Sequence, residues 1–306
     1  MASKRDFLSI DDVTVEELAE LLALSGKAKK NPTSWSQRLA GRRVALIFEK
    51  PSTRTRVSFE VAVSGMGAHP VVLRGDELQL GRGETIEDTG RVLSRYVDAM
   101  VVRTFGQDRL ERLAGASSVP IVNALSDLEH PCQALADLLT IQENLGELAG
   151  TAFAYIGDGN NVAHSLMFAG ALAGMDVRIA TPPGYEPYPQ VTERASDIAA
   201  QNNGKVSVTN VVAEAATGAR ALYTDVWASM GQEDSADERR KVFEHYRVDH
   251  NVVSMAASDV IVLHCLPAHR GEEIAADVLD GPRSVVWDQA ENRLYTQMAL
   301  LDWVLS

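Results

Sequence analysis

Short apolar runs alternate with helical patterns along nearly the whole chain. The clearest run is Val44–Phe48, whose length and composition are typical of a buried strand in a parallel sheet. Similar runs predict further strands at Pro70–Leu73, Ala99–Arg103, Pro120–Asn123, Ala152–Ile156, Val177–Ala180, Val206–Thr209, Ala221–Thr224, Val260–His264 and Ser284–Trp287. Alternation of strands and helices indicates βαβ units, and therefore parallel sheets.

Between these runs, apolar residues recur at helical spacing. Thr14 and Glu17 fit a capping box, and Leu18, Leu21 and Leu22 then share one helical face. Further helices are predicted at Thr53–Ser64, at Ile86–Val97, from Pro131 onward and over Gln289–Ser306. Proline suits a first helical turn, where its missing N–H costs no hydrogen bond.

The alternating pattern starts again after Gly146–Gly150. Two successive sets of strands predict an α/β fold with two domains, each a mainly parallel sheet flanked by helices, joined near residues 131–150. The chain has 306 residues and is 45% hydrophobic, which is enough apolar material for two medium cores.

The chain is acidic, with 42 Asp and Glu residues, 29 Lys and Arg residues and a formal net charge of −13. Such a surface argues against nucleic acid and against an anionic membrane as a partner. No run approaches the roughly 18 apolar residues of a membrane span. If the substrate is an anion, a few arginines near the site must outweigh the repulsion from the negative net charge of the chain.

Cysteine usage and the first residues indicate the compartment. Cys132 and Cys265 are the two cysteines, whereas a disulfide scaffold needs more at closer spacing, so we expect a reducing environment. Residues 1–10 lack the apolar stretch of a secretory signal and the acid-poor, Arg-rich character of a transit peptide. We therefore expect a cytoplasmic protein.

Unusual polar residues collect where the predicted strands end. Ligands of open parallel sheets bind at the carboxyl ends of strands, so we expect these residues to face a shared cleft. In the turn Ser52–Arg56 a strand leads into a helix, whose N-terminus, hydroxyls and guanidinium favour a phosphate. The alternative is a helix cap with two surface arginines. The turn lacks the glycine pattern of a nucleotide P-loop.

Two further strand ends carry candidate chemistry. His130 and Gln133 lie about one turn apart and could reach one small polar ligand, or they could belong to a capped helix with a buried structural histidine. Cys265 follows an apolar strand and is expected to line a site, although buried thiols are usually small hydrophobes. His264 and Cys265 are neighbours on that strand, so we expect opposite faces and no Cys–His nucleophile pair.

Neither a dinucleotide nor a metal ion is expected. Gly157–Asn161 has half of a dinucleotide fingerprint, but Val162 replaces the third glycine and no acidic residue ends the next strand; the asparagines remain possible ligand donors. The histidine pairs nearest to metal-ligand spacing are His245 with His250 and His264 with His269. Neither pair has a third ligand on a shared face, so we predict no metal and no cofactor.

Taken together, the motifs resemble those of the aspartate/ornithine carbamoyltransferase family over nearly the whole chain. They are, in order, Phe48–Arg56, His130–Gln133, Asp225–Gly231, His264–Pro267 and Asp288–Arg293. Each is weak alone, but the ordered set is highly specific. The resemblance implies a carbamoyl phosphate domain at 1–133 plus 289–306, an ornithine domain at 134–288, an active-site cleft between them, and a homotrimer or an assembly of trimers.

The implied reaction moves the carbamoyl group of carbamoyl phosphate to the side-chain amine of L-ornithine, giving L-citrulline and phosphate in arginine metabolism. We expect arginine biosynthesis, with the catabolic direction left open. The family's phosphate-binding residues match Ser52, Thr53, Arg54, Thr55 and, from a neighbouring subunit, Gln79. Its carbamoyl-binding residues match Arg103, His130, Gln133, Cys265, Leu266 and Arg293, and its ornithine-binding residues match Asn161, Asp225, Ser229 and Met230.

The expected catalytic residues are Arg103, His130, Gln133, Asp225 and Cys265. We expect Asp225 to bind the α-amino group, and Cys265 with the backbone at Leu266 to orient the attacking nitrogen. The resemblance also implies a cis Leu266–Pro267 bond. Arg82–Gly83 departs from several relatives, which leaves the affinity for the donor open.

Several alternatives remain. Cys265 could act covalently, although no neighbouring base is evident in the sequence. Acetylornithine or putrescine could replace ornithine, whereas aspartate would call for cationic side chains in the second domain. An oxidoreductase would need the missing glycine and acid. A non-catalytic relative would be expected to lack Arg54, Arg103, His130 or Cys265, and all four are present.

Overall fold

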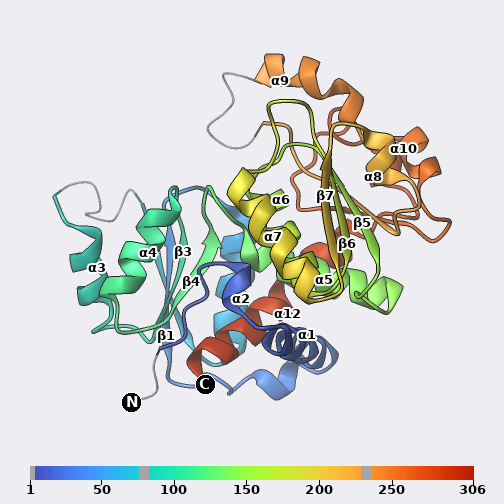
Figure 1. The fold of residues 1–306 in the computed structure, drawn as a ribbon. Helices are drawn as coiled ribbons and strands as arrows, with labels where there is room; N and C mark the ends of the chain where they lie inside the picture. Colours follow the sequence, from blue (N-terminus) through green and yellow to red (C-terminus); the bar gives the residue numbers. More distant parts are fainter. Residues whose placement is uncertain (1–3, 76–82, 229–235) are drawn as a thin grey trace. The chain divides into compact units, whose positions relative to one another are not determined.

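The computed structural model describes residues 4–75, 83–228 and 236–306 (Figure 1). It separates into two compact units, Met1–Ala136 with Glu291–Ser306, and Asp137–Ala290. Each unit contains one parallel sheet flanked by helices, which confirms the predicted fold class. The unit boundaries fall inside the helices α5 (Pro131–Leu145) and α12 (Val286–Leu305), so both connections between the units are helical.

The first unit is built on a four-stranded sheet in the order β2-β1-β3-β4. Its strands are β1 (Arg43–Phe48), β2 (His69–Arg74), β3 (Ala99–Arg103) and β4 (Ile121–Leu125). Its helices are α1 (Val15–Lys30), α2 (Thr53–Gly65), α3 (Ile86–Leu93) and α4 (Gln107–Ala116), with short 3-10 helices at Ile10–Asp12 and Pro32–Trp35. Figure 1 shows α3 and α4 on one face of the sheet, where they bury apolar residues of β1 and β3.

The second unit is built on a five-stranded sheet in the order β7-β6-β5-β8-β9. Its strands are β5 (Ala152–Ile156), β6 (Asp176–Ala180), β7 (Lys205–Thr209), β8 (Ala221–Thr224) and β9 (Ile261–His264). Its other helices are α6 (Asn161–Leu172), α7 (Pro189–Gln201), α8 (Val212–Ala216), α9 (Ala236–Phe243), the 3-10 helix Glu244–Tyr246, α10 (His250–Met255) and α11 (Ala276–Leu279). Figure 1 shows α6 and α7 side by side on one face of this sheet.

Each strand order contains a switch point at which the chain changes its direction of winding. In the first sheet it lies between β1 and β3, and in the second between β5 and β8. Residues that follow these strands therefore lie where open α/β sheets bind ligands. Strands β1, β3 and β8 are almost entirely buried, which explains their continuous apolar runs.

The chain departs from the predicted elements near its end. Ser284–Trp287 is not a strand, because Ser284 forms only an isolated bridge with Val262 and α12 already begins at Val286. Val286 is fully buried, and a short apolar run does not distinguish a strand from the first turn of a buried helix. The predicted helix start at Gln289 was therefore too late.

The predicted capping box and the predicted end of one helix have different outcomes in the structure. The capping box of Thr14 and Glu17 is confirmed, since each side chain accepts the other's backbone N–H. The helix predicted over Ile86–Val97 ends at Leu93, where the Ser94 hydroxyl donates to the carbonyl of Gly90 at 2.6 Å. None of the helices in the described part of the chain combines the length and apolar character needed to cross a membrane.

Candidate functional site

The turn after β1 forms a helix N-terminus lined with hydroxyl groups. Ser52 is the N-cap of α2, and its side-chain oxygen accepts a hydrogen bond from the backbone N–H of Thr55 at 3.3 Å. Thr53 and Arg54 are exposed, whereas Thr55 is buried. A helix start with exposed hydroxyl and guanidinium donors is suited to an anion such as phosphate.

Arg103 lies beside this turn, at the end of β3. Phe48 and Arg103 are register partners at the carboxyl ends of β1 and β3, the two strands that flank the switch point. The backbone N–H of Glu49 donates to the carbonyl of Arg103 at 2.9 Å. Only 7% of Arg103 is exposed, so its charge is largely shielded from solvent.

Arg293 connects three helix segments of the first unit. Its guanidinium donates to Oε1 of Gln133 and, at 3.0 Å, to Oγ1 of Thr55. All three side chains are buried. The predicted carbamoyl-binding residues Gln133 and Arg293 therefore contact one another, and both are tied to the phosphate-binding turn through Thr55.

His130 is surrounded by positive charge. Burial lowers the pKa of His130 well below its usual value, and the guanidinium groups of Arg293, Arg103 and Arg54 lower it further. The imidazole is therefore neutral at neutral pH, and it can donate through one ring nitrogen and accept through the other. Three guanidinium groups near a neutral ring form a strongly positive site in an otherwise acidic chain.

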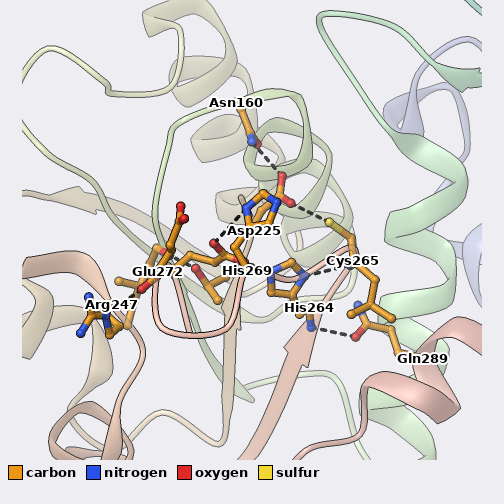
Figure 2. Close-up of polar contacts among 12 residues, drawn as sticks. Asn160, Asp225, Arg247, His264, Cys265, His269, Glu272 and Gln289 are labelled. Carbon is orange, nitrogen blue, oxygen red and sulfur yellow. Dashed lines mark hydrogen bonds and ion pairs between the residues drawn. The ribbon is translucent and has the colours of Figure 1, made fainter. Parts of the chain in front are cut away.

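In the second unit, Asn160 connects a helix start to Asp225. Its Oδ1 accepts hydrogen bonds from the backbone N–H groups of Val162 and Ala163 at 2.9 and 3.2 Å, which caps α6. Its Nδ2 donates to Oδ2 of Asp225 at 2.9 Å (Figure 2). Asn161, the predicted ornithine ligand, is the first residue of α6 and is partly exposed.

Cys265 and Asp225 are in direct contact. The Sγ of Cys265 donates a hydrogen bond to Oδ1 of Asp225 at 2.9 Å, so both carboxylate oxygens of Asp225 are held (Figure 2). Asp225 follows β8 and is 5% exposed, while Cys265 follows the neighbouring strand β9 and is partly exposed. This arrangement presents an oriented anion, which is suited to a cationic amine.

The turn after β9 corrects one prediction about these side chains. His264 and Cys265 were expected on opposite faces, but β9 ends at His264 and the chain turns there. The N–H of Leu266 donates to Nδ1 of His264 at 2.8 Å, Leu266 has a φ of 58°, and the Leu266–Pro267 bond is cis as expected. Because the turn brings the side chains back together, the thiol of Cys265 and the His264 ring reach the same neighbourhood.

His264 and His269, one of the two histidine pairs nearest to metal-ligand spacing, lie in two separate groups of potential ligand atoms. The nitrogen, sulfur and oxygen ligand atoms of His264, Cys265 and Asp225 lie within 4.8 Å of one another. A second group contains His269, Glu272 and Glu273. Oε1 of the buried Glu273 contacts the His264 ring and accepts a hydrogen bond from the backbone N–H of His269.

Gly159, in the segment Gly157–Asn161, has a packing role. A side chain at Gly159 would place its Cβ 2.3 Å from the backbone nitrogen of Pro187. The close approach of these two backbone segments explains the glycine without a bound pyrophosphate.

Three predicted site residues, Gln79, Ser229 and Met230, lie outside the described residues, as does Arg82. Conversely, Asn160 was not predicted to be the partner of Asp225, nor Glu273 to be the partner of His264. The predicted helix start after β5 could have indicated that Asn160 caps this helix. No sequence signal pairs Glu273 with His264.

Comparison with known proteins agrees with this geometry. Residues 5–143 match the aspartate/ornithine carbamoyltransferase carbamoyl-P binding domain, and residues 149–304 match the Asp/Orn binding domain of the same family. An ornithine carbamoyltransferase of Parafrankia sp. (strain EAN1pec) is 60% identical, covering 98% of this chain and 96% of the relative. The solved ornithine carbamoyltransferase from Pyrococcus furiosus is 50% identical with a TM-score of 0.95, covering 98% of this chain and 96% of that one.

Proposed function

The chain belongs to the aspartate/ornithine carbamoyltransferase family, and from this premise we propose how its residues divide the reaction. The enzyme transfers the carbamoyl group of carbamoyl phosphate to the side-chain amine of L-ornithine, giving L-citrulline and phosphate. The observation that best supports the division is the contrast between the two units. One gathers three guanidinium groups around a neutral histidine, and the other holds an oriented carboxylate.

Most of the residues assigned to carbamoyl phosphate belong to the first of these sites. We assign its phosphate to Ser52, Thr53, Arg54 and Thr55, with Gln79 from a neighbouring subunit. We assign its carbamoyl group to Arg103, His130, Gln133, Cys265, Leu266 and Arg293. The hydroxyl-lined start of α2 and the contact of Arg293 with both Thr55 and Gln133 support this division.

Arg103 and His130 polarise the carbonyl oxygen of the donor. As the amine attacks, negative charge develops on that oxygen, and buried donors stabilise such charge far better than water-exposed ones. The neutral imidazole of His130 contributes one N–H, and Arg103 contributes a permanent cation that is 7% exposed. Burial is the main cause of the lowered pKa of His130, and the cations that bind the donor lower it further.

Ornithine is held by the second unit. Asp225 binds the cationic α-amino group, and its carboxylate is fixed for this role by Asn160 and Cys265. We assign the α-carboxylate to Asn161 and the backbone N–H of Met230, and Ser229 to the same ornithine-binding set. Cys265 and the backbone of Leu266 orient the attacking nitrogen. The direct contact of Cys265 with Asp225 supports a positioning role for the thiol.

The acceptor must lose a proton before it reacts. An alkyl ammonium has a pKa near 10.4, so its deprotonation at neutral pH costs about 4 kcal/mol. The neutral amine then attacks the carbamoyl carbon, a C–N bond forms and the bond from that carbon to the phosphate oxygen breaks. The second amine proton passes to the departing phosphate, whose charge Arg54 neutralises. Catalysis is therefore largely a matter of binding and aiming the neutral amine.

Location, assembly and metabolic direction are further parts of this proposal. We propose that residues 1–133 with 289–306 bind carbamoyl phosphate and that residues 134–288 bind ornithine. We also propose a cytoplasmic homotrimer, or an assembly of trimers, that serves arginine biosynthesis. The two distant cysteines support the location. A relative from Pyrococcus furiosus described as anabolic, 50% identical, supports the direction.

The test is citrulline formation by the purified protein from carbamoyl phosphate and ornithine. Acetylornithine, putrescine and aspartate are assayed in parallel. We expect turnover with ornithine and none with the other three. Turnover with a different amine alone would keep the donor site and refute the assignment of Asp225 and its neighbours.

A further inference from the structure

Glu49 lies between two elements that hold the donor, yet its side chain has no assigned role with either substrate. It directly follows β1 and precedes the phosphate-binding turn at Ser52. Its backbone N–H donates to the carbonyl of Arg103 at 2.9 Å, so the chain at Glu49 is already attached to the end of β3. The side chain of Glu49 is only 12% exposed. A carboxylate in such a position must be paired, because burying an isolated charge is costly.

Two groups pair with this carboxylate and also contact each other. The hydroxyl of Thr104 donates to Oε2 of Glu49 at 2.9 Å, and Nη2 of Arg109 donates to Oε1 at 3.0 Å. The Nε of Arg109 also donates to Oγ1 of Thr104 at 3.3 Å. The three side chains form a closed triangle. Thr104 is the residue after Arg103, and Arg109 lies in the first turn of α4.

The triangle joins the two strand ends that flank the switch point of the first sheet. One corner, Glu49, leads into the residues that hold the phosphate, and another, Thr104, follows the residue that polarises the carbonyl. The distance between the phosphate-binding turn and Arg103 must suit the length of carbamoyl phosphate. The alternative is that Arg109 and Glu49 form an ordinary stabilising ion pair. The pair of Arg112 with Glu87, by comparison, is more exposed and joins the helices α3 and α4.

We infer that Arg109 is a positioning residue for carbamoyl phosphate. It holds the carboxylate of Glu49 against Thr104 and thereby sets the distance between the phosphate-binding turn and Arg103. A planar guanidinium can donate to Glu49 and Thr104 at once, whereas a lysine ammonium is a point charge on a flexible stem. The inference rests on the proposed function, since it specifies how that donor site is built.

The test compares four variants with the wild-type enzyme in steady-state kinetics. For Arg109→Ala we expect the KM for carbamoyl phosphate to rise about tenfold, because displacements of about 1 Å in a binding site cost up to 100-fold. Competitive inhibition by inorganic phosphate should weaken in parallel, while the KM for ornithine stays within about twofold. Arg109→Lys should recover part of the loss. Thr104→Val, which keeps the side-chain volume, should shift the same two constants.

Arg220→Ala is the matched control. Arg220 pairs with Asp259 in the second unit, and its side chain is 36% exposed, close to the 34% of Arg109. It should leave the constants for carbamoyl phosphate and phosphate unchanged. The inference is overturned if the Arg109 variants and Thr104→Val lower only the melting temperature, or if they weaken both substrates equally. A wild-type enzyme that forms no citrulline would instead refute the proposed function.

Discussion

Asn160 orients Asp225 with the same side chain that caps α6. Its Oδ1 accepts from two backbone N–H groups of the helix start, which leaves its Nδ2 directed at Oδ2 of Asp225, 2.9 Å away. One side chain therefore caps the helix and orients the proposed amine-binding carboxylate. Because the two roles use different atoms of Asn160, a substitution can remove one and keep the other.

Asn160→Ser should separate capping from orientation. Serine can still accept at the helix start, but it has no N–H group to reach Asp225. We expect kcat/KM for ornithine to fall about tenfold to a hundredfold, as for the loss of a hydrogen bond to a charged group. The KM for carbamoyl phosphate should stay nearly constant. Asn160→Ala should show the same kinetic loss and a further loss of stability of about 1 kcal/mol. Full activity of the serine variant would exclude an orienting role.

Cys265→Ser should impair the enzyme without abolishing turnover. A serine hydroxyl can still donate to Oδ1 of Asp225, so the carboxylate remains held while the position of the amine changes. We expect kcat to fall by about tenfold to a hundredfold, the range typical of imperfect positioning. Mass spectrometry of the wild-type enzyme with carbamoyl phosphate alone should detect no carbamoyl-thioester. Such an adduct, together with complete loss of activity in the variant, would refute the non-covalent scheme.

His130 should make the folded state less stable in mild acid. Because burial and nearby guanidinium groups lower its pKa in the fold, only the unfolded chain gains this proton as the pH falls below about 6.5. Stability then falls by up to about 1.4 kcal/mol per pH unit until the folded-state pKa is reached. Urea unfolding near pH 7 and pH 5.5 should show that His130→Gln loses about 1 kcal/mol less than the wild type over this range. Equal losses would contradict the lowered pKa.

Arg293→Gln should weaken the donor site and raise the pKa of His130. The guanidinium is the largest contributor after burial to the lowering of that pKa, and it also holds Thr55 and Gln133. We expect a higher KM for carbamoyl phosphate, weaker inhibition by phosphate, and an acid limb of the kcat/KM profile that moves to higher pH. The matched Arg38→Gln change, which removes a surface pair with Asp302, should alter none of these. A fixed acid limb would argue that the arginine does not act on His130.

The two cysteines should react at very different rates. Burial raises the pKa of Cys132 to about 12, so at pH 8 only about one molecule in ten thousand carries its thiolate. Cys265 is partly exposed, and a thiol reagent should modify it alone in the native enzyme. Cys265→Ser should therefore incorporate no label until it is unfolded. Ornithine with phosphate should protect Cys265 in the wild type. Rapid labelling of Cys132 would contradict its burial.

Much of the fold follows from local patterns. A buried parallel strand needs apolar side chains on both faces, so runs such as Val44–Phe48 and Ala99–Arg103 are evident without coordinates. The same local reasoning failed at Ser284–Trp287, since an apolar run at the start of a buried helix has the same composition. It also failed at Cys265. Because β9 ends at His264, the side chains of these two neighbours do not alternate between opposite faces of the sheet.

The sequence by itself determined most of the strands and helix starts, because strand and helix periodicities and helix caps act over a few neighbouring residues. It therefore identified the hydroxyl-rich turn at Ser52 and the positions of Arg103 and Cys265. Only the tertiary structure decided which of these residues meet. Strand order brings Arg103 beside Glu49, and Arg109 completes a contact between residues 60 positions apart. Contacts at such separations depend on how whole elements pack, and no local pattern encodes that packing.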